Sequence, residues 1–196
     1  MAAGPGSAVA AAARWLVLVA LAVAGGGGAA AAGEAALWAA VRDGEAFAMI
    51  RHALAPGFGD PPHFTLGDCA TQRNLSDQGR AQAQAIGARF RDHGIAEARV
   101  YTSEWCRCRE TADLLGLGPP TALPALNSFF SRPERRAAQT AALASWLADR
   151  RDEDRPLVLV THQVNIGALT AVGTGSGEIV VARREADGRI TVLGTL

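Results

Sequence analysis

Two histidines and two arginines of this 196-residue chain are side chains of the kinds that bind and transfer a phosphoryl group: Arg51, His52, Arg107 and His162. Guanidinium groups match the oxygen geometry of a phosphate group, and a neutral imidazole can attack phosphorus to form a phosphohistidine. Charge neutralisation and positioning supply most of the acceleration of such a transfer. We therefore predict His52 as the nucleophile between two phosphate-binding arginines, with a protonated His162 as a further donor. This chemistry calls for no metal ion and no cofactor, and none is predicted.

Each of these side chains lies beyond a short apolar segment that is typical of a buried strand. The segments are 46–50, 98–102 and 157–161, and they alternate with helical patterns at 34–42, 76–93, 105–115, 133–150 and 164–170. Strand–helix alternation predicts an α/β fold with a mostly parallel sheet covered on both faces. Because ligand sites of such sheets lie beyond the carboxyl ends of the strands, three loops would converge on one crevice.

The rest of the pattern fits a single globular domain. Residues 54–72 are rich in Gly, Pro and Asp and indicate a long functional loop, while 179–182 and 190–193 indicate a closing hairpin. The 19 basic residues balance 19 acidic ones, which argues against a non-specific nucleic-acid binder. The expected partner is therefore a small phosphorylated compound and no nucleic acid.

The first 32 residues differ from the rest of the chain. Arg14 precedes an apolar run at 15–24, and small residues follow it. This order is typical of a secretory signal peptide, and an uncleaved N-terminal anchor is the alternative. We expect a folded domain at 33–196 in the periplasm or outside the cell, touching a membrane only through an uncleaved N-terminal segment.

Three cysteines are present, at positions 69, 106 and 108. An oxidising compartment would permit one disulfide and leave one thiol. Cys106 and Cys108 are too close in sequence for a relaxed bridge in most backbones, so we predict Cys69 paired with one of them. The spacing matches no structural zinc pattern.

Four segments resemble, in order, the motifs of the histidine phosphatase superfamily, which includes the phosphoglycerate mutases. They are Ile50-Arg51-His52-Ala53, Leu75-Ser76-Asp77-Gln78-Gly79-Arg80, the stretch from Thr102 to Ala112, and Val160-Thr161-His162. They resemble the Arg-His-Gly, Leu-Thr-x-x-Gly and Ser-x-x-x-Arg-x-x-x-Thr-Ala elements and the segment with the second histidine. The resemblance implies a three-layer α/β/α sandwich of the phosphoglycerate mutase-like kind. It also implies a phosphorylated His52 in a pocket of Arg51, Arg107 and His162.

The chain departs from that family at two positions. Ala53 replaces the glycine after Arg-His, and Asn127 lies near the place where many members carry a glutamate proton donor. An asparagine amide does not protonate a leaving alkoxide. Either another acid serves, with Asp60, Asp68 and Glu178 as candidates, or the leaving group needs little help. The second case would favour phosphohistidine or acyl-phosphate substrates.

Arg73, Asp68, Asn127 and Glu178 are the further candidates for substrate binding. The segments Gly67-Asp68-Cys69 and 161–166 resemble those of exported members akin to the lipopolysaccharide core heptose phosphatases, which implies an envelope phosphosugar as substrate. The alternative is a non-catalytic phosphoglycan-binding protein on the same fold.

His93, Trp105 and Trp146 are expected to be structural residues. His63 is expected to be exposed in its loop, with contact to substrate as the alternative, and Arg109 is expected to contact a glutamate or solvent. His93 in particular lies near a predicted helix C-terminus, where a cation is favourable.

Overall fold

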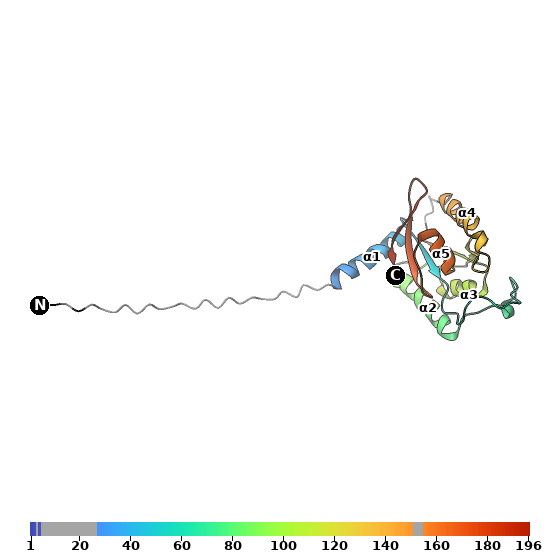
Figure 1. The fold of residues 1–196 in the computed structure, drawn as a ribbon, viewed down its shortest axis with the longest axis horizontal. Helices are drawn as coiled ribbons and strands as arrows, with labels where there is room; N and C mark the ends of the chain where they lie inside the picture. The colour runs from blue at the N-terminus through green and yellow to red at the C-terminus, as the bar shows by residue number, and fades with distance from the viewer. Residues whose placement is uncertain (3, 5–26, 151–154) are drawn as a thin grey trace.

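The computed structural model describes residues 1, 2, 4, 27–150 and 155–196, and these form a central sheet between two layers of helices (Figure 1). In the described residues the sheet has six strands in the order β3-β2-β4-β1-β5-β6. The strands are β1 (Phe47–Arg51), β2 (Arg99–Thr102), β3 (Thr121–Ala122), β4 (Leu157–Thr161), β5 (Ile179–Arg184) and β6 (Ile190–Thr195). The first four strands in this order are parallel, whereas β5 and β6 are antiparallel to their neighbours. The predicted, mostly parallel sheet and its closing hairpin are confirmed.

The two central strands explain the layered architecture. β1 and β4 are apolar almost throughout and buried on both faces, as parallel strands between helices must be. Because successive side chains of a strand point to opposite faces, Ile50 and Val160 join one apolar core and Met49 and Leu159 join the other. The sheet therefore separates two cores, each of which needs a helical cover.

Five α-helices provide these covers within the described part of the chain. They are α1 (Gly27–Arg42), α2 (Asp77–Asp92), α3 (Cys106–Leu115), α4 (Arg136–Ala148) and α5 (Gln163–Thr170). Trp38, Phe90 and Leu115 place α1, α2 and α3 over one face. Leu143 and Ile166 place α4 and α5 over the other. This is the three-layer α/β/α sandwich that the sequence predicts.

Close backbone packing fixes the start of α2 beside the segment that follows β1. The hydroxyl of Ser76 accepts a hydrogen bond from the amide of Gly79 at 3.1 Å and so caps the helix. A Cβ atom on Gly79 would lie 2.1 Å from the carbonyl oxygen of Leu54, so no side chain fits there. The Leu-Ser-Asp-Gln-Gly segment thus anchors the chain just beyond His52.

The boundaries differ from the prediction in a few places. α1 begins seven residues earlier than the predicted start at residue 34, and the predicted helix at 133–150 is a 3-10 turn, Pro133–Arg135, followed by α4. The short strand β3 and the 3-10 turns Cys69–Thr71 and Pro124–Leu126 were not predicted, because so few residues show no periodicity.

Most of the predicted signal peptide or anchor, at 1–32, lies outside the described residues. Within the described ranges, no helix has both the length and the apolar character that crossing a membrane requires.

Candidate active site

The carboxyl ends of β1, β2 and β4 meet at one edge of the sheet, and β4 holds the two loops beside it. The amide of His52, just after β1, donates to the carbonyl oxygen of Thr161 at 2.9 Å. The amide of Ser103, just after β2, donates to the carbonyl oxygen of Val160 at 3.0 Å. His162 follows β4 directly. The three predicted loops therefore do converge.

His52 is buried, with 2% of its surface exposed, and its ring has a defined orientation. Nδ1 lies 2.8 Å from the carbonyl oxygen of Ala53, which only accepts, so Nδ1 carries the hydrogen. Burial, joined by the charges of Arg107, Arg73 and Arg51, lowers the pKa of His52 to about 3 against the raising effect of the Ala53 carbonyl. The ring is therefore neutral, and Nε2 keeps its lone pair.

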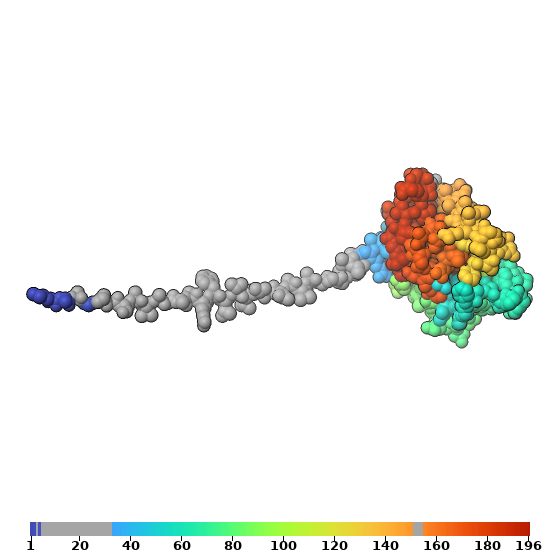
Figure 2. All heavy atoms as spheres, in the orientation of Figure 1, coloured from blue at the N-terminus to red at the C-terminus, as the bar shows by residue number. Residues whose placement is uncertain are grey.

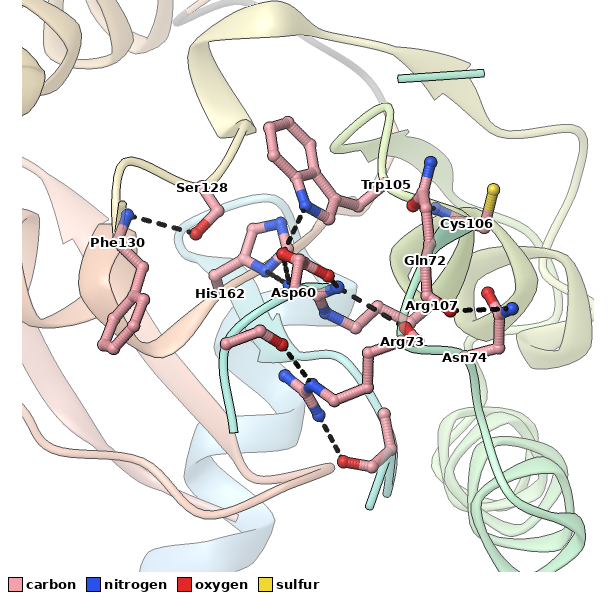
Figure 3. A network of polar contacts seen from close by, with 12 residues as sticks. Asp60, Gln72, Arg73, Asn74, Trp105, Cys106, Arg107, Ser128, Phe130 and His162 are labelled. Atoms are coloured by element: carbon pink, nitrogen blue, oxygen red, sulfur yellow. Dashed lines mark hydrogen bonds and ion pairs between the residues drawn. The ribbon is translucent and has the colours of Figure 1, made fainter. Parts of the chain in front are cut away.

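Arg107, near the start of α3, is 3% exposed and faces the same pocket. Its Nη1 and Nη2 lie 2.5 and 3.2 Å from the two carboxylate oxygens of Asp60, as Figure 3 shows. Its Nη2 also lies 3.5 Å from Nδ1 of His162. Its Nε is buried and has no hydrogen-bond partner among the described residues.

Two further arginines border the pocket, Arg51 at the end of β1 and Arg73 on the loop before α2. Nη1 of Arg51 donates to the carbonyl oxygen of Thr174 at 2.7 Å, while its buried Nε has no partner among the described residues. Nε of Arg73 donates to the carbonyl oxygen of Gly59 at 2.8 Å. Burial, followed by the charge of Arg107, lowers the pKa of both guanidinium groups. Three cations thus surround a site that holds one carboxylate.

His162 is 3% exposed and lies edge to face with His52, with ring centroids 5.5 Å apart. Its Nε2 is 2.9 Å from the hydroxyl of Ser103. Burial and then Arg107 hold the pKa of His162 well below its usual value. Burial beside three arginines therefore favours a neutral His162 in the site without substrate, and the protonated form predicted for the site with a bound phosphoryl group stays a prediction.

These side chains line an open pocket that encloses about 480 Å³, part of it open to solvent. Phe58 and Phe130 form its rim and lie edge to face, with ring centroids 4.9 Å apart. In the space-filling view, the teal loop after β1 borders the yellow segment that leads into α4 (Figure 2). The mouth of the pocket is thus aromatic and its floor is cationic.

The other predicted substrate-binding residues do not all reach this pocket. Arg73 lines it, as does the candidate acid Asp60. Asp68 is exposed and caps a 3-10 turn by accepting from the amide of Ala70 at 3.0 Å. Glu178 accepts from the amide of Gly175 at 2.7 Å and does not line the pocket. Local backbone donors hold both carboxylates away from the residues that line the pocket, and the contact of Asp68 and Glu178 with substrate stays a prediction.

Asn127 lies behind the pocket and supports His162 from there. Its Oδ1 accepts from the Ser103 hydroxyl at 3.2 Å and from the Glu104 amide at 2.8 Å. Its Nδ2 donates to the Glu104 carboxylate at 2.6 Å. Asn127 thus supports His162 through Ser103, and its contact with substrate stays a prediction.

Trp105 has a larger part than the packing role predicted for it. Its ring stacks on Phe64 at 5.0 Å, and its Nε1 donates to Oδ2 of Asp60 at 3.0 Å. His93 is structural as predicted, stacked on Trp38 at 4.6 Å. Trp146 packs against Tyr101, while His63 and Arg109 are exposed.

The cysteines lie beside the site and follow the prediction in part. Cys69 and Cys106 form a disulfide, which selects one of the two predicted pairings. Cys108 is a buried free thiol whose pKa burial raises to about 12. Among the described residues, no group of three or more His, Cys, Asp or Glu side chains is arranged to hold a metal ion.

Two residues of the site were not predicted, Thr111 and Ser103. The Thr111 hydroxyl accepts from the amide of Ala53 at 3.0 Å and donates to the carbonyl oxygen of Arg107 at 2.7 Å. It therefore ties the turn after His52 to the helix that carries Arg107. Both residues belong to the Ser-x-x-x-Arg-x-x-x-Thr-Ala element, which is the signal that could have identified them.

Comparison with known sequences gives one family and one curated relative. Residues 49–129 match the profile of the histidine phosphatase superfamily (branch 1). Over 65 residues the chain is 35% identical to the mitochondrial serine/threonine-protein phosphatase Pgam5 of Drosophila virilis. That match covers 33% of this chain and 22% of the relative, so the chain spans only a small part of its length.

Solved structures resemble this chain over a longer range than the sequence matches do. The protein histidine phosphatase SixA complexed with tungstate gives a TM-score of 0.56 at 16% identity, over 77% of this chain and 96% of that one. Mycobacterial glucosyl-3-phosphoglycerate phosphatase, complexed with VO3, gives 0.58 at 17% identity, over 76% and 96%. The phosphoserine phosphatase of Entamoeba histolytica, with 3-phosphoglyceric acid, gives 0.55 at 14% identity, over 76% and 95%. At these identities the likeness is one of fold.

Proposed function

Because the chain belongs to the histidine phosphatase superfamily, we propose that it is a phosphatase that transfers a phosphoryl group to Nε2 of His52 and then to water. The observation that carries the proposal is the state of His52. The ring is neutral, and the bond from Nδ1 to the Ala53 carbonyl oxygen leaves Nε2 as the free nucleophile.

The cations of the pocket support the second half of the chemistry. Arg51 and Arg107 both line the pocket, and each keeps a buried Nε without a partner among the described residues. Guanidinium forks fixed before the substrate arrives stabilise the charge that spreads over the phosphoryl oxygens in the transition state. Neutralisation by arginines is sufficient for this reaction, so the mechanism we propose uses no metal ion.

A His162 that is neutral before substrate binds is compatible with its proposed role as a donor to the phosphoryl oxygens. Before substrate binds, Arg107 donates toward its Nδ1 and its Nε2 bonds Ser103. A bound phosphate dianion would add negative charge beside the ring and so raise its pKa. His162 then becomes a donor to the phosphoryl group only when the substrate is present.

The test is turnover of a generic aryl phosphate by the purified protein. His52→Ala should abolish release of phosphate, and trapping of the wild-type enzyme with substrate should add one phosphoryl group to its mass. His63→Ala is the matched control, because His63 is an exposed histidine of the loop after β1. Full activity of the His52→Ala variant would exclude this nucleophile.

Two alternatives rest on Asn127, which replaces the glutamate of many relatives. If no acid assists, the substrates are compounds with good leaving groups, such as a phosphohistidine or an acyl phosphate. If no transfer occurs, the same cationic pocket serves a phosphoglycan-binding protein. Saturable binding of phosphosugars without turnover during long incubation would favour the binding protein, whereas turnover would exclude it.

We further propose that the protein acts outside the cytoplasm on an envelope phosphosugar. The apolar run at 15–24 and the disulfide between Cys69 and Cys106 support export, because disulfides persist in oxidising compartments. Fractionation of cells that express the full chain tests the location, and a panel of phosphosugars and phosphopeptides tests the substrate class.

A further inference from the structure

The carboxylate of Asp60 occupies the donors that a substrate phosphate would need. It accepts from both terminal nitrogens of Arg107, and Oδ2 also accepts from Nε1 of Trp105 at 3.0 Å (Figure 3). The ion pair is secluded, since the side chains of Arg107 and Asp60 are 3% and 18% exposed. A carboxylate held by a guanidinium fork has the same donor geometry as a bound phosphate. A phosphoryl group that binds Arg107 must therefore displace Asp60.

The loop that carries Asp60 is built to permit this displacement. Gly57 and Gly59 have φ angles of +95° and +66°, conformations that glycine adopts without strain. Glycine moves between these and the mirror-image conformations at little cost, so the backbone before Asp60 can turn without a steric barrier. Arg73, which donates to the carbonyl oxygen of Gly59, holds the loop on the pocket side.

Asp60 is also the sole carboxylic acid among the described residues that line the pocket. The side chain of Asn127 is an amide and not an acid, and Asp68 and Glu178 accept from backbone amides and do not line the pocket. A leaving alkoxide needs a proton from a group within hydrogen-bond reach. In this pocket the acid that can come within reach is on the loop after β1.

We propose that Asp60 gives up Arg107 to the phosphoryl group when the substrate binds and then acts as the general acid for the leaving group. This inference rests on the proposed phosphatase function and adds a second catalytic residue to it. Asp60 is thus a ligand of Arg107 before the substrate binds and a proton donor afterwards.

The electrostatics of the site support this change of role. Burial raises the pKa of Asp60, but hydrogen bonds from Arg107 and Trp105 and the charges of Arg107 and Arg73 outweigh it and lower the pKa while the ion pair is intact. Once Arg107 turns to the phosphoryl oxygens, its hydrogen bonds and its charge no longer lower the pKa of Asp60. Burial and the adjacent anion then raise that pKa against the remaining effects of Trp105 and Arg73, and so favour the protonated acid.

Every proton is accounted for over the two steps, transfer of the phosphoryl group to His52 and its hydrolysis. The substrate monoanion brings one proton, which passes to the Asp60 carboxylate. Nε2 of His52 forms a bond to phosphorus while the bond from phosphorus to the leaving oxygen breaks, and that oxygen takes the proton from Asp60. Water then forms the new bond to phosphorus as the N–P bond breaks. The Asp60 carboxylate accepts the water proton and returns it to the departing phosphate.

Asp60→Asn tests the acid role, because the amide keeps the shape and the acceptor oxygen but does not protonate an alkoxide. For an alkyl phosphate such as glycerol phosphate we expect kcat/KM to fall by about 100-fold or more. For p-nitrophenyl phosphate, whose leaving group needs little protonation, the fall should stay below about tenfold. Asp187→Asn, an exposed acid of the turn between β5 and β6, is the control and should change neither value.

Equal losses on both substrates would overturn the acid role and leave Asp60 as a positioning residue, and no loss on either would overturn it outright. A second measurement tests the displacement without turnover. Inorganic phosphate should bind Asp60→Asn about tenfold more tightly than the wild type by calorimetry, because the amide competes less strongly than a carboxylate for Arg107. Equal or weaker binding would contradict it.

The two proposals fail in different ways. Absence of wild-type turnover on every phosphate ester would refute the phosphatase function and the acid role, while tighter phosphate binding by the variant would still establish the displacement. If the wild type turns over normally and Asp60→Asn loses the same share of kcat/KM on glycerol phosphate and on p-nitrophenyl phosphate, only the acid role is refuted.

Discussion

The Nδ1 atom of His52 donates to the carbonyl oxygen of Ala53, and this contact within one dipeptide orients the ring. The two residues are neighbours in the chain, so the bond forms as soon as the backbone turns after β1. It determines which nitrogen is the nucleophile without any other side chain. The substitution of alanine for the glycine of the motif leaves it intact, since Ala53 fits fully buried.

Burial of a neutral His52 makes stability depend on pH. The pKa of a histidine is about 6.5 in an unfolded chain, and that of His52 is about 3 in the folded one. Between these values the unfolded state binds a proton that the folded state does not, so the free energy of unfolding falls as the pH falls. The slope is about 1.4 kcal/mol per pH unit for each such histidine. Denaturant titrations at pH 7, 6 and 5 should give a shallower slope for His52→Asn than for the wild type; parallel slopes would refute it.

Gly79 should tolerate no side chain. A Cβ atom there would lie 2.1 Å from the carbonyl oxygen of Leu54, which is backbone and does not rotate away. We expect Gly79→Ala to lower the free energy of unfolding by about 1–3 kcal/mol. Gly173→Ala is the control, since no atom of the described residues lies within 4 Å of the methyl group that it would gain. Equal stability of the two variants would contradict the close approach.

The disulfide should contribute strongly to stability. Cys69 and Cys106 are 37 residues apart, and closure of a loop of that length corresponds to about 4 kcal/mol in the chain-entropy model. Thermal unfolding with and without dithiothreitol measures this, and the Cys69→Ser/Cys106→Ser variant should not respond to the reductant. Alkylation should modify no thiol of the native, oxidised protein, because Cys108 is buried and its pKa is raised to about 12. Rapid labelling of the folded protein would disprove this.

Asn127→Ala should weaken the support of His162. It removes the acceptor of the Ser103 hydroxyl and of the Glu104 amide, for an expected stability loss of about 1–2 kcal/mol and a several-fold lower kcat. Asn127→Asp keeps the acceptor but places a second carboxylate 2.6 Å from that of Glu104, so it should be less stable at pH 7 than at pH 4 relative to the wild type. Unchanged kcat in Asn127→Ala would mean that His162 needs no such support.

The aromatic rim should influence specificity and leave stability alone. Phe58 and Phe130 are 87% and 48% exposed, so Phe58→Ala and Phe130→Ala should change the free energy of unfolding by less than about 0.5 kcal/mol. An aromatic leaving group gains about 1 kcal/mol from an edge-to-face contact, so KM for an aryl phosphate should rise about fivefold. KM for glycerol phosphate should stay constant. A parallel rise for both substrates would assign the rim to positioning of the loop.

The strands and the convergence of the site were predictable because both depend on order along the chain. Segments such as 157–161 are apolar enough to be read directly, and parallel strands necessarily bring their carboxyl ends together. The pairing of Asp60 with Arg107 was not predictable in the same way. The two residues are 47 positions apart, and Asp60 lies in a loop without periodicity.

Burial explains the remaining differences. The neutral state of His162 depends on how deeply the ring lies beside three arginines, which the sequence does not report. The capping role of Asp68 was in principle readable, since aspartate is among the favoured residues at a helix start. The resemblance of its segment to exported relatives instead predicts a substrate-binding role for Asp68.

The last two residues of β4 hold the backbones of both neighbouring loops through carbonyl oxygens alone, at Val160 and Thr161. No side chain takes part in these two bonds, so a substitution at Val160 or Thr161 does not remove the backbone groups that form them. The rim residues, by contrast, lie on segments that no strand holds. Residues at the mouth of the pocket can therefore change during evolution, and the substrate with them, while the reacting groups keep their relative positions.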